Sequence, residues 1–439
     1  MDFKLNHEQR EFQRKCRRFA AEVIRPVAAQ HDRDESVPWE AIKAARDWGL
    51  HGLETLQLMG EDPDGILSCI YSEEMHWGCA GIALAIQGGS LAAAGIASSG
   101  TPEQIGRWVP ECFGTGDEIK LGAYAVTEPG AGSDVRSLRT TAKLDTQGGT
   151  AGDEWVLNGT KVFITNGGIA DVTVVVATVD AELGHRGQAS FVVPKGTPGL
   201  SQGKKESKLG IRASQTTEVI LEDCRVPMEH LLGGDEKLQK KLERARSGES
   251  TGRSSNALAT FELTRPLVGA SALGIAQAAY EWTLDYLADK EEDGQPLLHQ
   301  QRVQQVLADV ATEIEAARLL VWRAAWMGRN GMPLTAGQGS MSKLKGGDVA
   351  MWATTTLMDV VGPFAQTTDC PLEKWFRDAK IYQIFEGTAQ MQRLVIARMQ
   401  TNEHKRRIGD ADDVLHQAPG NAPNDSAVAE APRAVAEAS

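Results

Sequence analysis

Two long stripes of apolar residues at helical spacing dominate the second half of the chain and constrain its fold most strongly. They are Val268, Ala272, Ile275, Ala279, Trp282 and Tyr286, and then Val303, Leu307, Val310, Ile314, Ala317, Val321 and Ala324. Steps of three and four residues place each set on one face of a helix. Two such helices joined by a polar turn predict an antiparallel helical bundle, whose seams often also form subunit contacts.

The first 120 residues also show apolar residues at helical spacing. Phe12, Cys16, Phe19 and Val23 repeat on one helix face before Pro26, which we expect to break the helix. The stretch 100–103 reads as an N-cap with proline at the first helical position. We therefore expect an N-terminal α-helical domain over residues 1–120.

The middle of the chain has a different sequence pattern. Residues 172–177 form a short β-branched run of the kind found in a buried strand, and 191–194 and 218–222 predict further strands. The stretches 155–159 and 161–164 resemble a hairpin that turns at Asn158–Gly159. These patterns predict a central β domain over 121–232, a charged insertion at 233–260, a helical bundle at 261–405 and a disordered tail at 406–439.

Length and charge narrow the class of protein. A chain of 439 residues is expected to form two or three packed domains. Its formal net charge of -13 argues against nucleic acid or anionic membrane as a partner. No apolar run approaches the ~18 residues of a membrane span, and the start resembles no targeting segment. Six scattered cysteines without a CxxC pair fit a reducing compartment, so we expect a cytoplasmic protein without a metal site.

The strongest local motif is the stretch 123–134, AYAVTEPGAGSD, an apolar strand that opens into a loop of small residues. Its glycines let backbone N–H groups approach an anionic or planar ligand, and Thr127 and Ser133 add hydroxyl groups. A tight turn in a β domain explains the glycines equally well. The motif is neither a GxGxxG fingerprint nor a Walker A loop, which excludes the Rossmann and P-loop interpretations.

Two further motifs follow. Residues 161–168, KVFITNGG, form a strand that ends in a polar turn, and an ordinary hairpin turn is the simpler explanation. In 377–393, Glu386 follows Ile384 and Phe385 and precedes a glycine. A carboxylate in apolar surroundings loses hydration, which raises its pKa from ~4.3 and makes it a stronger base. From the local sequence alone, Glu386 could instead cap the next helix near Thr388.

All three motifs, in this order and at these separations, resemble the acyl-CoA dehydrogenase family. The resemblance runs from roughly residue 4 to 400 and includes 208–214, 222–227 and 261–266. It implies a mostly α, α+β fold with an N-terminal helical domain, a central β-barrel-like domain and a C-terminal four-helix bundle. It also implies FAD-dependent α,β-dehydrogenation of an acyl-CoA to a trans-2-enoyl-CoA, with electrons passed to an electron-transfer flavoprotein. An acyl-CoA oxidase, an enoyl-CoA reductase-like member and a subunit of a hetero-oligomer are the alternatives.

The resemblance also implies roles for individual residues. Glu386 would be the base, and the N–H of Gly387 would polarise the thioester carbonyl. Some branches of the family place the base at the position of Thr264, which cannot act as one. The family usually has tryptophan at Phe163. The positions expected to contact FAD are Tyr124, Val126, Thr127, Gly132, Ser133, Phe163, Thr165, Gln301, Thr388 and Gln390, and those expected to contact the substrate are Ser133, Glu262 and Arg265.

The chain also departs from the family pattern. Two motifs that normally reach a neighbouring subunit's FAD are degraded here, at 290–294 and 359–365. We therefore expect a rearranged or weaker FAD site between the subunits of a homo-oligomer (a dimer or tetramer), or a partner subunit that supplies the missing contacts. The insertion is either a solvated charged helix or a segment whose Arg244, Arg246 or Arg253 meets the CoA phosphates. Small residues at 92–95 predict room for a medium or larger acyl chain.

Overall fold

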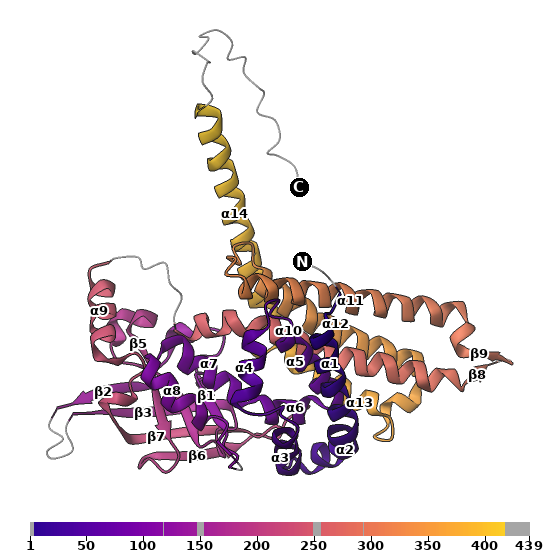
Figure 1. Cartoon of the computed structure of the whole chain (residues 1–439), viewed down its shortest axis with the longest axis horizontal. Helices are drawn as coiled ribbons and strands as arrows, with labels where there is room; N and C mark the ends of the chain where they lie inside the picture. The colour runs from indigo at the N-terminus through magenta and orange to yellow at the C-terminus, as the bar shows by residue number, and fades with distance from the viewer. Residues whose placement is uncertain (1–3, 117, 147–152, 249–255, 293, 418–439) are drawn as a thin grey trace, which may run out of the picture.

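The computed structural model describes residues 4–116, 118–146, 153–248, 256–292 and 294–417, with the backbone alone at 256–263 and 409–417. A curled sheet occupies one end of the molecule and long helices the other, with the N-terminal helices packed between and beneath them (Figure 1). This is the mostly α architecture, with a central β domain, that the sequence predicts.

The N-terminal part is helical, as expected. Its elements are α1 (His7–Phe19), the π-helical turn η1 (Ala20–Ile24), α2 (Arg25–Asp34), α3 (Trp39–Asp47), α4 (Leu53–Glu61), α5 (Leu67–Gly78), α6 (Ala80–Gln87), α7 (Gly89–Ser99) and α8 (Pro102–Glu111). Thr101 caps α8 in a reciprocal capping box with Gln104, which confirms the N-cap predicted at this point.

Pro26 does not end the first helix. It is the second residue of α2, directly after the π turn η1, and the residues before it keep right-handed helical φ/ψ, so the chain continues as helix. The π turn before it inserts one residue into the helical repeat. For this reason Ile24 is buried in the core, whereas Val23, predicted on the buried face, is only half-buried.

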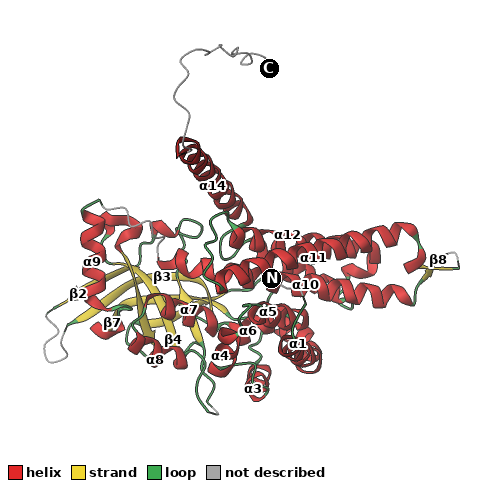
Figure 2. Ribbon diagram, turned by 45° about the horizontal axis from the view of Figure 1, so that its top comes forward, coloured by secondary structure: helices red, strands yellow, loops and turns green. Residues whose placement is uncertain are grey.

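The sheet has seven strands in the order β1-β4-β2-β3-β7-β6, with β5 paired to β4. Strands β1 and β4 are parallel, and β3 lies antiparallel to β2 and β7. The strands are β1 (Gly122–Ala125), β2 (Thr141–Asp145), β3 (Glu154–Thr165), β4 (Val172–Thr178), β5 (Gln188–Pro194), β6 (Leu200–Lys205) and β7 (Thr216–Pro227). Helices α7, α8 and α9 surround this sheet (Figure 2).

The predicted hairpin at Asn158–Gly159 is wrong, because β3 runs through both residues as one strand. Its register against β7 shifts between Leu157 and Gly159, which marks a β-bulge. Gly159 has a φ of +152°, and an added Cβ would lie 2.5 Å from Oγ1 of Thr140. The Asn-Gly pair therefore serves a bulge, which uses the same backbone freedom as a hairpin turn.

The insertion contains the predicted charged helix, α9 (Gly234–Arg246). Its Leu238 and Leu242 pack into the core of the β domain, so the helix is a lid on that core as well as a solvated surface. Arg246 forms an ion pair with Asp180 at 2.8 Å, whereas Arg253 lies outside the described residues.

The C-terminal bundle is built from α10 (Asn256–Ala288), α11 (Gln301–Arg329), α12 (Gln338–Val361), α13 (Pro371–Ala379) and α14 (Ala389–Gln417). All seven residues of the second predicted stripe are buried on α11. Helices α10 and α12 cross closely, since a Cβ on Gly346 would lie 2.7 Å from the carbonyl oxygen of Gly269. Helix α14 projects from the body and continues to Gln417, into the predicted tail, while residues 418–439 lie outside the described residues (Figure 1).

Within the described part of the chain, one helical stretch is apolar enough to cross a membrane by length and composition. It spans Ala80–Ser99, which includes α6 and α7, and its mean hydropathy is 1.5. The fold buries 61% of that stretch, and α7 packs against β1 and β4. These helices are therefore core elements that join the N-terminal helices to the sheet.

Candidate active site

Glu386 lies in a tight turn between the short helix η8 (Lys380–Gln383) and α14. Both Glu386 and Gly387 have positive φ, +51° and +94°. A left-handed glutamate is uncommon and is held only where its surroundings require it. Thr388 is the cap of α14, because its Oγ1 accepts a hydrogen bond from the N–H of Met391 at 3.2 Å. The alternative that Glu386 merely caps this helix is therefore wrong.

The carboxylate of Glu386 points toward α10. Thr264 donates a hydrogen bond from its Oγ1 to Oε2 of Glu386 at 2.5 Å. Burial raises the pKa of Glu386 above its ordinary value, although this hydrogen bond and the charges of Lys343 and Arg265 oppose the effect. A carboxylate with a raised pKa binds a proton more strongly, which suits a general base.

The two substrate positions on α10 have different outcomes. Arg265 is buried, and its positive charge lowers the pKa values of both Glu386 and Lys343. It therefore lies close to the carboxylate. The side chain of Glu262 lies outside the described residues. Contacts of either residue with CoA stay predictions.

The first two motifs lie side by side. The N–H of Val162 donates to the carbonyl of Thr127 at 2.8 Å, which joins the loop after β1 to β3 next to Phe163. Tyr124 and Val126 are buried beneath this loop, whereas Gly132 and Ser133 are exposed on it. The loop does contain a tight turn, since Glu128 and Ala131 exchange backbone hydrogen bonds, but the turn presents the residues that follow it to solvent.

A buried ion pair fixes this loop, and sequence reasoning missed it. Nζ of Lys161 lies 2.8 Å from Oε1 of Glu128 and 2.9 Å from the carbonyl oxygen of Val126. Glu128 also accepts hydrogen bonds from the N–H groups of Arg139 and Thr140 at 2.6 and 2.9 Å. Burial alone would raise the pKa of Glu128, but Lys161 outweighs it and the pKa is lowered. A lysine within the apolar strand KVFI was the available signal.

The residues around these loops fit a flavin. Phe163 has a φ of +58° and is 64% exposed, so its large aromatic side chain is available to contact a ligand. On the Glu386 turn, Ile384 is 48% exposed. An added Cβ on Gly130 or Gly132 would meet no described atom within 4 Å, which leaves room for a ligand close to the backbone. Half-buried Thr165 follows Phe163 on β3. A planar ring with a phosphate tail matches an aromatic face beside a glycine loop.

Comparison with known proteins decides the family. The chain matches the models of the acyl-CoA dehydrogenase N-terminal domain at residues 6–114, middle domain at 123–224 and C-terminal domain at 254–400. It is 38% identical over 385 residues to the mitochondrial short-chain specific acyl-CoA dehydrogenase of Rattus norvegicus, which covers 87% of both chains. The chain belongs to the acyl-CoA dehydrogenase family. The predicted family, its fold and its FAD dependence are thereby confirmed.

Two other members of the family are informative. The chain is 38% identical over 399 residues to the acryloyl-CoA reductase (NADH) of Anaerotignum propionicum, covering 91% of this chain and 95% of the relative. Among solved structures, butyryl-CoA dehydrogenase from Megasphaera elsdenii is similar with a TM-score of 0.79 at 35% identity, covering 90% of this chain and 99% of that chain. The similarity therefore extends over nearly the whole chain.

One expected FAD residue does not join the others within a single chain. Gln301 is the first residue of α11, which begins beside the β8–β9 hairpin (Glu291–Glu292 and Gln295–Pro296), at the opposite end of the molecule from the sheet (Figure 1). A contact between Gln301 and FAD thus requires a second copy of the chain. Thr388 and Gln390, in contrast, lie within four residues of Glu386.

The degraded motifs lie at this same far end of the bundle. Trp282, Tyr286 and Phe364 stack on one another, with ring centroids 5.0 and 5.6 Å apart. Nζ of Lys290 lies 4.9 Å from the Tyr286 ring centroid. An aromatic stack therefore organises a region where family members normally present FAD contacts.

The small residues of α7 have a packing explanation. An added Cβ on Gly95 would lie 2.6 Å from Cε2 of Tyr124, and one on Gly122 would lie 2.8 Å from Cβ of Ala92. Close approach of α7 to β1 thus requires small side chains at these positions. The inference of room for a medium or larger acyl chain stays a prediction.

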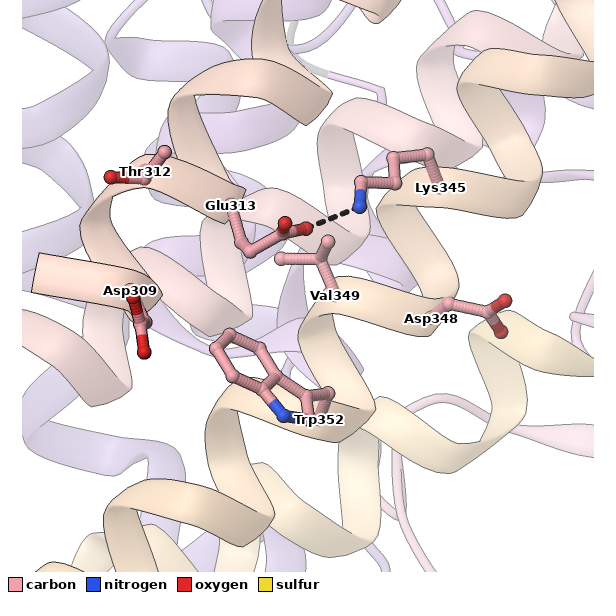
Figure 3. Close-up of a pocket in the computed structure, with 7 residues that line it drawn as sticks. All are labelled: Asp309, Thr312, Glu313, Lys345, Asp348, Val349 and Trp352. Carbon is pink, nitrogen blue, oxygen red and sulfur yellow. Dashed lines mark hydrogen bonds and ion pairs between the residues drawn. The ribbon is translucent and has the colours of Figure 1, made fainter. Parts of the chain in front are cut away.

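A surface cavity of about 410 Å³ lies between α11 and α12 (Figure 3). Lys345 and Glu313 form an ion pair across it, and Trp352 forms part of its wall. The cavity contains no residue that the sequence assigned to the active site. Asp348 of α12 also lines this cavity, while Lys343 on the same helix is buried.

Proposed function

We propose that this chain dehydrogenates a short acyl-CoA at its α and β carbons, with Glu386 as the base that removes the α proton. The observation that carries the proposal is the environment of the Glu386 carboxylate. Its pKa is raised by burial, and it lies on a turn in which both Glu386 and Gly387 have positive φ. General bases of this kind contribute about 10²- to 10⁴-fold to rate.

The other residues of the site polarise the substrate, orient Glu386 and hold the cofactor. The N–H of Gly387 polarises the thioester carbonyl and makes the α carbon more acidic. Thr264 holds the carboxylate of Glu386 in one orientation through its hydrogen bond. Residues of the Thr127–Ser133 loop, Phe163, Thr165, Thr388 and Gln390 hold FAD, which supplies the acceptor for the hydride from the β carbon. The product is a trans-2-enoyl-CoA.

The proposed substrate class is short acyl chains. Support comes from the 38% identity to a short-chain specific relative and the structural similarity to a butyryl-CoA dehydrogenase.

The proposed setting is a cytoplasmic homo-oligomer that passes electrons to an electron-transfer flavoprotein. All six cysteines are free and buried, which suits a reducing compartment. The position of Gln301, at the far end from the sheet, favours an assembly in which two copies complete each FAD site.

A second candidate is the reverse reaction, reduction of an enoyl-CoA. The similarity to an acryloyl-CoA reductase favours it. The same residues serve both directions, because a protonated Glu386 returns a proton to the α carbon. The redox partner then determines whether electrons leave the substrate or are passed to it.

Turnover with a series of straight-chain acyl-CoAs tests the proposal. We expect the highest kcat/KM at four to six carbons with an electron-transfer flavoprotein or an artificial dye as acceptor, and little oxygen consumption. A maximum at 12 or more carbons would contradict the short-chain assignment. Faster oxidation of NADH with acryloyl-CoA than reduction of dye with butyryl-CoA would favour the reductase.

A further inference from the structure

The turn that carries Glu386 is held by side chains from two helices. Gln392 of α14 donates from Nε2 to the carbonyl oxygens of Glu386 and Gly387 at 3.2 and 3.1 Å. Lys343 of α12 donates from Nζ to the carbonyl oxygen of Gly387 at 2.8 Å. Both donors are almost fully buried, at 1% exposure each. No sequence motif predicts a role for either residue.

The contact of Gln392 with the Glu386 carbonyl sets the direction of the Gly387 N–H. Lys343 binds the carbonyl of the next peptide and so holds Gly387 from its other side. In a trans peptide the C=O and N–H point in opposite directions. Because Gln392 binds the carbonyl of Glu386, the N–H of Gly387 in the same peptide must point away from Gln392. The glycine is required here, since an added Cβ would lie 2.5 Å from Nε2 of Gln392.

Lys343 reaches this turn because α12 lies unusually close to it. An added Cβ on Gly347, one turn after Lys343, would lie 2.6 Å from the carbonyl oxygen of Tyr382. Burial lowers the pKa of Lys343 to about 8, while Glu386 and Asp348 favour its charged form. A charged donor on the Gly387 carbonyl forms a stronger hydrogen bond than a neutral one.

Asp348, also on α12, fixes the chain on both sides of the turn. It accepts hydrogen bonds from Nε2 of Gln383 at 2.8 Å and from the guanidinium of Arg393 at 2.6 Å. The segment from Gln383 to Arg393 is therefore attached to α12 before, at and after the catalytic glutamate.

We propose that Lys343 and Gln392 are positioning residues that aim the N–H of Gly387 at the thioester carbonyl, so that the acidity of the substrate's α carbon depends on them. This inference rests on the proposed function, because it assumes a thioester in front of Glu386. Neither residue touches the substrate. Lys343 adds a second effect, since its charge stabilises the ionised form of Glu386.

The test measures carbonyl polarisation directly. The FAD-loaded protein is mixed with 3-thiabutyryl-CoA labelled with ¹³C at its carbonyl, a probe whose β atom is sulfur and carries no hydride. Infrared difference spectra then report the carbonyl stretch. In wild type we expect a shift to lower frequency than in solution. Lys343→Met and Gln392→Met should each lose about half of that shift or more, with kcat for butyryl-CoA falling roughly 10- to 100-fold and the probe's affinity changing much less.

Two further variants separate the roles. Lys345→Met removes a lysine from the same helix, but one that pairs with Glu313 across the outer cavity, and should behave as wild type (Figure 3). Lys343→Arg keeps both charge and donors and should recover part of the shift. In Lys343→Met the acid limb of the pH–rate profile should also move to higher pH, because Glu386 loses a stabilising cation, whereas Gln392→Met should leave it in place.

The outcomes are distinct. An unchanged carbonyl shift in both methionine variants would overturn the proposal. So would failure of both variants to hold flavin when Lys345→Met holds it, since the residues would then support the fold rather than the carbonyl. If only Lys343→Met fails to fold, the carbonyl shift in Gln392→Met tests the proposal alone. Bleaching of wild-type flavin by butyryl-CoA tests the proposed function separately, so failure of one claim is not mistaken for failure of the other.

Discussion

At the scale of single residues, the base strength of Glu386 results from opposing effects. Burial raises its pKa, and one hydroxyl and two cations restrain the increase. Thr264 occupies the position from which other branches of the family supply their base, and here it orients the carboxylate instead. The threonine is therefore a part of the site with a measurable effect on pH dependence.

Thr264→Val should move the acid limb of the kcat/KM profile to higher pH. The sign follows from the hydrogen bond, which stabilises the ionised carboxylate; without it the pKa of Glu386 rises further and the base is protonated over a wider range. On the acid side of the limb we expect activity to fall about tenfold, since a hydrogen bond to a charged group contributes roughly 1.5 kcal/mol or more. A limb that stays in place or moves to lower pH would show that the hydroxyl does not act on Glu386.

At the scale of elements, a buried ion pair joins the glycine loop to the sheet. Lys161→Met should leave the carboxylate of Glu128 buried and unpaired, at a cost of ~3–5 kcal/mol in the free energy of unfolding. FAD should also bind more weakly, because the loop loses its anchor at the carbonyl of Val126. Chemical denaturation and flavin titration measure both effects.

The double variant Lys161→Met/Glu128→Gln is the control for that prediction. It removes the unpaired charge and should recover part of the lost stability, but less of the lost FAD affinity. Equal stability of the single variant and wild type would show that the pair does not hold the loop.

The contact of α7 with β1 gives a second test at this scale. Gly95→Ala places a methyl group against the ring of Tyr124 and should lower the free energy of unfolding by ~1–3 kcal/mol. Gly106→Ala is the matched control, because Gly106 lies in α8 with open space around an added Cβ and should be neutral or gain up to ~1 kcal/mol. Equal stability of the two variants in thermal unfolding would show that α7 does not pack tightly against Tyr124.

Sequence patterns predicted the elements well where one physical signal dominated. The seven-residue stripe of α11 and the capping box of α8 are such cases. Where one signal serves two structures, prediction failed: Asn158–Gly159 indicates positive φ, which a bulge uses as readily as a hairpin. Val23 was misplaced because a π turn shifts the helical repeat without a clear sequence mark.

Within the site, motifs identified Glu386 and the glycine loop, but not the residues that hold them. Lys343 looks like an ordinary surface lysine until its helix is known to lie against the turn. Gly346 and Gly347, three and four residues later, are the one sequence hint of that close contact. Positioning residues depend on tertiary contacts, which periodicity and composition do not encode.

At the scale of the whole molecule, ion pairs connect the N-terminal helices to the bundle. Arg318 of α11 pairs with Glu73 of α5 at 2.7 Å, and Arg17 of α1 pairs with Glu281 of α10 at 2.9 Å. The N-terminal helices and the bundle are thus held together, while the start of α11 lies at the far end of the molecule (Figure 1).

This arrangement predicts that FAD binding depends on assembly. On dilution, flavin fluorescence should rise in step with dissociation of the oligomer, because each site then loses contacts from the other copy. Gln301→Ala should shift this release to higher protein concentration. Analytical ultracentrifugation at matched concentrations provides the second measurement, and a monomer that keeps its FAD as tightly as the oligomer would contradict the prediction.

The most direct test of the account is the absorbance of protein-bound flavin after butyryl-CoA is added without oxygen. Wild-type flavin should lose its 450-nm absorbance rapidly. In Glu386→Gln the flavin and the ligand should still bind, but the bleaching should be slower by about 10²- to 10⁴-fold. Bleaching of Glu386→Gln at the wild-type rate would contradict the account, because the α proton would then leave without the carboxylate on which every other assignment in the site depends.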